Sequence, residues 1–92
     1  MTDACEIVLT IVNELGLHAR AATMFVQVAA KYESDILIIK DGREVNGKSI
    51  MGILTLVASK GTKIRVQAKG PDAEAFLEAI SKLVQDKFGE ER

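Results

Sequence analysis

Several residue types that often carry structure or chemistry are scarce in this sequence of 92 residues. It contains one cysteine, one proline, one histidine and no tryptophan. A lone cysteine excludes a disulfide within the chain, and one cysteine with one histidine gives too few ligands for a metal site. The β-branched residues that follow Cys5 predict a strand in which its thiol is a small, buried or half-buried side chain.

Charge of one sign and long apolar runs are also lacking. The formal net charge is −1, and the lysines and arginines are spread without a run, which argues against a nucleic-acid partner. The longest apolar stretch, Ile50 to Ala58, is interrupted and far too short for membrane insertion. Residues 1–3 show no secretory signal, and no glycine-rich nucleotide loop occurs. We expect a cytoplasmic protein without a cofactor.

The length and the 48% apolar content predict a single domain, residues 1–92, with a largely aliphatic core. Alternating apolar residues predict strands over residues 5–12, 35–40, 43–46 and 63–69, and Asp41-Gly42 predicts a type I′ hairpin turn. Helical spacing predicts helices over residues 19–32, from Ile50 within the apolar run, and from Pro71 to about residue 88, leaving residues 90–92 as a frayed tail.

The order βαββαβα indicates an α+β fold. Because each strand alternates, one sheet face must be covered by helices while the other meets water. We expect a two-layer open-faced sandwich: a four-stranded, mainly antiparallel sheet with three helices on one face.

The only histidine, His18, lies where the first strand gives way to the first helix. A helix N-terminus presents unpaired amides and a partial positive charge, which suit an anion. Gly16 allows the backbone to turn, and Arg20 is close enough to reach the same anion. A nearby dipole end and cation favour a neutral, nucleophilic imidazole. From these residues alone, a phosphoryl-accepting histidine and a plain capping histidine both remain open.

Two segments resemble signatures of one family. Gly16-Leu17-His18-Ala19-Arg20 resembles the active site of HPr, the histidine phosphocarrier of the bacterial sugar phosphotransferase system. Val45-Asn46-Gly47-Lys48-Ser49-Ile50-Met51-Gly52 resembles the segment around that family's regulatory serine. The spacing of the two motifs, the element order and the chain length also fit.

The resemblance implies a monomeric phosphoryl relay rather than an enzyme. His18 would accept a phosphoryl group from enzyme I, on the ring nitrogen nearer the backbone, and pass it to an enzyme IIA domain. Arg20 and the first amides of the helix would steady the phosphate, and Ser49 would be modified by an HPr kinase/phosphorylase. Partner-binding residues would be Ala19, Thr23, Ile50, Met51 and Leu54.

One residue departs from the family pattern. Ala21 stands where the family usually has proline, which presets the backbone of the first helical turn. The loss should cost only about 0.4–1 kcal/mol through the unfolded state, so we expect the site to survive with slightly less preorganisation.

Other interpretations remain. Ser49 alone predicts only a helix cap, and Ile50, Met51 and Leu54 could all belong to the core. Within the family, the chain could be a nitrogen-branch regulatory phosphocarrier instead of a sugar-branch one. Outside it, the element order also fits a non-catalytic, ferredoxin-like ligand-binding module.

Overall fold

A computed structural model describes residues 4–92, so the chain start in which the sequence shows no secretory signal lies outside the described residues. The strands are β1 (Ala4–Thr10), β2 (Asp35–Lys40), β3 (Arg43–Asn46) and β4 (Lys63–Lys69). The helices are α1 (Ala19–Ala29), α2 (Ile50–Leu54) and α3 (Ala73–Gln85), followed by a short 3₁₀ helix, η1 (Lys87–Gly89). The predicted order βαββαβα is confirmed.

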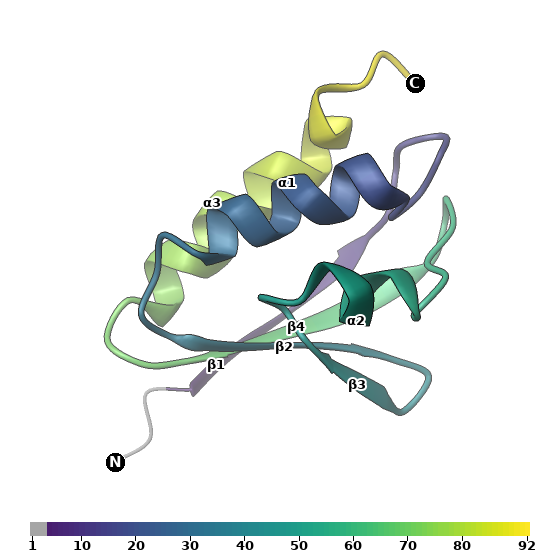
Figure 1. Ribbon diagram of the computed structural model, residues 1–92. Coiled ribbons are helices and arrows are strands. Elements are labelled where there is room, and N and C mark those ends of the chain that lie inside the picture. Colours follow the sequence, from purple (N-terminus) through teal and green to yellow (C-terminus); the bar gives the residue numbers. More distant parts are fainter. Residues whose placement is uncertain (1–3) are drawn as a thin grey trace.

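The four strands form one sheet in the order β1-β4-β2-β3, and every pair is antiparallel. Val66 of β4 is central, since it pairs with Ile7 on one side and Ile38 on the other. Figure 1 shows all three helices on the same side of this sheet. The two-layer open-faced sandwich is therefore confirmed. Because β4 is antiparallel to both β1 and β2, these two strands run parallel with β4 between them, which is a split βαβ unit. The strand pairing alone therefore does not separate this fold from a ferredoxin-like one.

The core lies between the sheet and the helices. It is mainly aliphatic, as predicted, but all three phenylalanines, Phe25, Phe76 and Phe88, are fully buried in it. The Phe76 ring contacts Phe25 and Tyr32 edge to face, with centroids 6.1 and 5.5 Å apart. The few aromatic side chains thus join α1 to α3.

Several local predictions are tested by the backbone. Asp41 and Gly42 have φ angles of 51° and 80°, as a type I′ turn requires, and Cys5 is half-buried. Several boundaries were wrong. β1 ends at Thr10 rather than residue 12, and α3 ends at Gln85, before the short η1. α1 ends at Ala29 because Tyr32 N–H bonds to Ala29 O in a tighter turn. α3 begins at Ala73, so Pro71 precedes the helix instead of opening it.

Candidate functional site

The loop that leads from β1 to α1 is tightly held at Gly16. Its φ of +67° is left-handed, and a Cβ there would lie 2.4 Å from Ala58 O. The next residue, Leu17, donates its N–H to the same carbonyl at 2.8 Å. Only glycine fits such a turn and such a close approach, so the sequence-based interpretation of Gly16 is confirmed and given a reason.

His18 is the N-cap residue of α1. Its backbone is extended (φ −75°, ψ 179°), its carbonyl accepts from Ala22 N–H at 2.8 Å, and its side chain makes no capping hydrogen bond. The imidazole, 28% exposed, is therefore free for another role. In the first turn, the amides of Ala19, Arg20 and Ala21 bond to no backbone group of residues 4–92, which leaves the donors an anion would need.

The main contact of the His18 ring was missed by sequence reasoning. Nε2 lies 2.6 Å from Oε2 of Glu90, whose side chain is only 11% exposed. Asn13 donates from Nδ2 to Oε1 of the same carboxylate at 3.1 Å. The prediction of a frayed tail over residues 90–92 is thus wrong. The carboxyl-terminal segment is folded back onto the start of α1, and the Arg92 carbonyl accepts from Glu14 N–H at 2.9 Å.

The Glu90 carboxyl is the perturbed acid of the site. Desolvation by burial raises its pKa, but hydrogen bonds from His18 and Asn13, with the positive charges of His18 and Arg20, outweigh burial and lower the pKa overall. Glu90 is therefore a carboxylate at neutral pH. This negative charge beside the imidazole is not indicated by the sequence motif, which contains only the helix end and Arg20.

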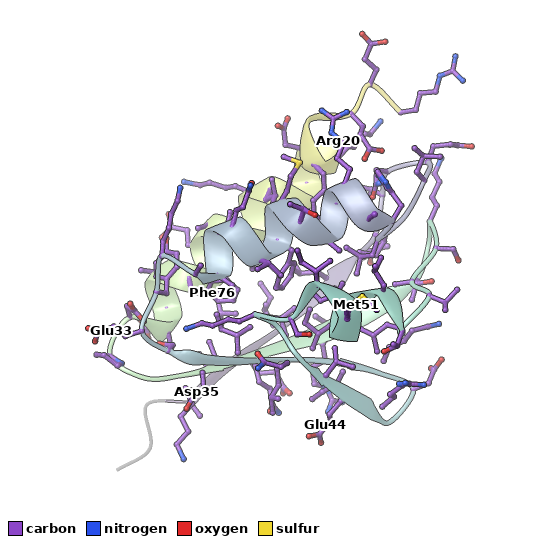
Figure 2. The ribbon with its side chains drawn as sticks, viewed as in Figure 1. Arg20, Glu33, Asp35, Glu44, Met51 and Phe76 are labelled. Carbon is purple, nitrogen blue, oxygen red and sulfur yellow. The ribbon has the colours of Figure 1, made fainter. Side chains whose placement is uncertain are left out.

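Arg20 is exposed and lies beside the carboxyl-terminal segment, as Figure 2 shows. It lines a cavity of about 470 Å³ together with Glu90 and Arg92. The remaining predicted residues of α1 are close by in sequence: Ala19 is exposed, and Thr23 is half-buried with its hydroxyl bonded to Ala19 O at 2.8 Å. The structure therefore places the guanidinium at the same helix end as the imidazole.

Ser49 caps α2, as predicted. Its Oγ accepts from Gly52 N–H at 3.0 Å, and its backbone is extended. The apolar residues that follow divide between surface and core: Ile50 is 36% and Met51 74% exposed, Ile53 is fully buried, and Leu54 is partly buried against the core. Figure 2 shows Met51 on α2. Exposure of Ile50 and Met51 removes the interpretation that the whole run is core.

Two further apolar side chains lie near His18 and were not singled out from the sequence. Leu15 is 67% and Val57 is 75% exposed. With His18 and Leu54, both line a cavity of about 270 Å³. Isolated exposed apolar residues are ordinary, but these two border the histidine. No periodic pattern in the sequence marks them, because both lie in irregular segments.

Within residues 4–92, no group of three or more His, Cys, Asp or Glu side chains could hold a metal ion. The same part of the chain includes no helix with the length and hydropathy that a transmembrane span needs.

Comparison with known proteins decides the family. The family model described as "PTS HPr component phosphorylation site" matches residues 5–86. The chain belongs to the HPr family. Phosphocarrier protein HPr of Xylella fastidiosa (strain Temecula1) is 47% identical over 83 residues, which cover 90% of this chain and 93% of that protein.

Solved structures of this family agree with the fold. HPr from Thermoanaerobacter tengcongensis superposes with a TM-score of 0.92 at 45% identity, covering 96% of this chain and 99% of that one. Crh from Bacillus subtilis, solved as a dimer with an unexpected swapped domain, gives a TM-score of 0.73 at 43% identity, covering 80% and 85%. The general role of an HPr-family chain is that of a phosphocarrier in the phosphotransferase system, which agrees with a relay rather than a catalytic enzyme.

Proposed function

We propose that this HPr-family chain accepts a phosphoryl group from enzyme I on His18 and passes it to an enzyme IIA domain. The observation that carries the proposal is the N-cap position of His18. There the imidazole makes no capping bond and is partly exposed, beside free amides and Arg20. Ionised Glu90 can only accept a hydrogen bond, so Nε2 carries the proton in this pair and Nδ1 keeps its lone pair.

The geometry supports transfer to Nδ1. Its lone pair forms the nitrogen–phosphorus bond while the donor's bond to phosphorus breaks, and the leaving group keeps that electron pair. The phosphoryl oxygens carry negative charge, which amides at a helix N-terminus and an arginine fork stabilise. Return transfer to the next acceptor is the same step in reverse, so the chain is a substrate of its partners.

The test is phosphorylation in a reconstituted system. Incubation with enzyme I and phosphoenolpyruvate should add one acid-labile phosphoryl group, detected by intact mass spectrometry. His18→Ala should abolish the addition, while Ser49→Ala, a matched control at the other motif, should retain it. Labelling that survives in His18→Ala, or absence of labelling in the wild type with an active enzyme I, would contradict the proposal.

Ser49 is proposed as the regulatory site, in addition to its role as a cap. A phosphate on Oγ would place negative charge beside exposed Ile50 and Met51, which with Ala19, Thr23 and Leu54 we assign to the partner-binding surface. Charge on an apolar interface opposes docking by desolvation. The protein phosphorylated at Ser49 by an HPr kinase/phosphorylase should therefore accept phosphoryl from enzyme I more slowly; equal rates would contradict this role.

The choice between sugar and nitrogen branches is tested by the acceptor. We propose the sugar branch, on the resemblance of the segment around Ser49, so the phosphorylated protein should transfer to a sugar-specific enzyme IIA faster than to a nitrogen-regulatory one. We also propose that the protein is a monomer, because residues 4–92 form a hydrophobic core within a single chain. Light scattering distinguishes the monomer from a swapped dimer of the kind solved for Crh.

A further inference from the structure

Among the described residues, Glu90 is the one charged side chain that forms a hydrogen bond or ion pair with the His18 ring, and no sequence motif accounts for it. We propose that Glu90 is a positioning residue for phosphoryl transfer: its carboxylate holds the Nε2–H of His18 and thereby presents Nδ1 as the nucleophile. The inference rests on the proposed function, since it assigns how the accepting nitrogen is selected.

The backbone is unusually shaped at the point that brings Glu90 to His18. Lys87, Phe88 and Gly89 have successive φ angles of 56°, 54° and 77°. Left-handed conformations are unfavourable for residues with a Cβ. Two such residues in a row persist only where the surroundings enforce them. Here Phe88 is fully buried in the core, so it anchors the turn and directs the next residues toward α1.

The carboxylate is itself held in place. Asn13, which is fully buried, uses Nδ2 to donate both to Gly16 O at 2.9 Å and to Glu90 Oε1 at 3.1 Å. Its Oδ1 has no hydrogen-bond partner within residues 4–92, so the two donated bonds fix the orientation of the amide. A chain of contacts therefore runs from the Gly16 turn through Asn13 and Glu90 to the imidazole. Such orienting partners fix the tautomer and direction of a histidine ring.

The position of the proton on the His18 ring decides which nitrogen can attack phosphorus. A neutral imidazole has one nitrogen with a proton and one with a lone pair. With the proton kept on Nε2 by Glu90, only Nδ1 can attack phosphorus. For a protein-bound phosphoramidate donor, the donor nitrogen keeps the electron pair of the broken bond and no proton moves. The phosphorylated ring gains positive character, which the carboxylate on Nε2–H stabilises.

A purely electrostatic role for Glu90 predicts the opposite effect. A carboxylate close to the imidazole repels an incoming phosphoryl group, so its removal would then speed the reaction. Glu90→Gln separates the two roles, because its amide oxygen can still accept from Nε2–H while the negative charge is gone. Glu90→Ala removes both the charge and the acceptor. Glu91→Ala is the matched control, since Glu91 is the adjacent, exposed glutamate.

The experiment combines NMR of the ring with single-turnover kinetics. In mildly alkaline buffer, the wild type and Glu91→Ala should show an Nε2–H proton protected from solvent exchange, and Glu90→Ala should lose it. Phosphorylation by enzyme I should slow about tenfold or more in Glu90→Ala, in the range typical of groups that orient a histidine. The loss should fall on the transfer rate at saturating enzyme I rather than on binding, and Glu90→Gln should recover most of it.

Two results would overturn the inference: an unchanged Nε2–H signal in Glu90→Ala, or a transfer rate in that variant equal to or above that of Glu91→Ala. Failure of the proposed function looks different. If the wild type accepts no phosphoryl group, the relay is wrong, while the NMR comparison still tests whether Glu90 holds the ring. Circular dichroism of each variant checks that the fold is retained.

Discussion

At the scale of single residues, Ala21 lies in the first turn of α1 beside the candidate site, and its backbone amide decides how the helix responds to proline. It is the third residue of α1, fully buried, and its amide has no backbone partner among the described residues. A proline here therefore loses no helical hydrogen bond, whereas Ala22 donates to His18 O at 2.8 Å. The two neighbouring alanines should thus respond to proline in opposite ways.

We predict that Ala21→Pro raises the free energy of unfolding by about 0.4–1 kcal/mol, because it restricts the unfolded chain. The melting temperature, measured by calorimetry, should rise by a few degrees for a domain of this size. Ala22→Pro is the control and should destabilise by about 3 kcal/mol, since it removes the bond to His18 O. A fall in melting temperature for Ala21→Pro would mean that the ring does not fit against its buried surroundings.

Single residues also show how far the sequence could lead. His18, Arg20 and Gly16 were placed together because they are neighbours in sequence and the motif fixes their helix end. Glu90 could not be placed, since its contact with His18 spans 72 positions and depends on a left-handed turn pinned by buried Phe88. A glutamate near a chain end has no periodicity, and tertiary packing alone decides where it lies.

At the scale of elements, α2 and the segment after it carry the exposed apolar residues. The helix was predictable from Ser49 as its cap, but its end was not. Val57 follows in a left-handed conformation (φ 51°), and Lys40 Nζ donates to Leu56 O and Val57 O at 3.1 and 3.3 Å. A β-branched residue disfavours this conformation, so no propensity rule would have placed valine there.

We predict that Val57→Asn raises the free energy of unfolding by about 1 kcal/mol, because asparagine tolerates the left-handed region. Little buried area is lost, since the valine is 75% exposed. Urea denaturation measures the change. Val57→Thr, which is polar but still β-branched, should give no such gain. If both variants stabilise equally, polarity rather than relief of backbone strain is responsible.

Strained backbone conformations lower stability and are often retained at functional sites. Val57→Asn and Val57→Thr should therefore both weaken binding to enzyme I, although only the first gains stability. Titration calorimetry with enzyme I tests this, and unchanged affinity in both variants would mean that Val57, which lines the cavity beside His18, does not contact enzyme I.

At the scale of the whole molecule, two carboxylates join segments that are far apart in the chain. Glu90 links the carboxyl-terminal segment to the start of α1. Asp72, at the start of α3, accepts from Ser34 Oγ at 2.5 Å and from the amides of Glu33 and Ser34 at 2.8 and 3.0 Å. It thus holds the connection between α1 and β2. The order of elements could be predicted from the alternation of apolar and polar residues and from the turn residues. The long-range hydrogen bonds of Glu90 and Asp72 could not.

The hydrogen bonds of these two carboxylates should make the free energy of unfolding depend on pH in the acidic range. The hydrogen bonds from the Ser34 side chain and the Glu33 amide outweigh desolvation and lower the pKa of Asp72, and the pKa of Glu90 is also lowered. A carboxyl whose folded pKa lies below its unfolded pKa stabilises the fold above the unfolded value, about 4. That stabilisation is lost as pH falls through the folded value.

We therefore predict that the free energy of unfolding is nearly flat in the neutral range and falls steeply below about pH 4. Asp72→Asn should flatten this fall, and Asp72→Asn with Glu90→Gln should flatten it further, as measured by urea denaturation at each pH. Asp41→Asn, the same chemical change in the exposed hairpin turn, should leave the slope as in the wild type. If all three variants keep the wild-type slope, neither carboxylate couples folding to pH, and the acid sensitivity arises elsewhere. If the double variant flattens the fall no further than Asp72→Asn alone, the contact between Glu90 and His18 orients the ring without stabilising the fold.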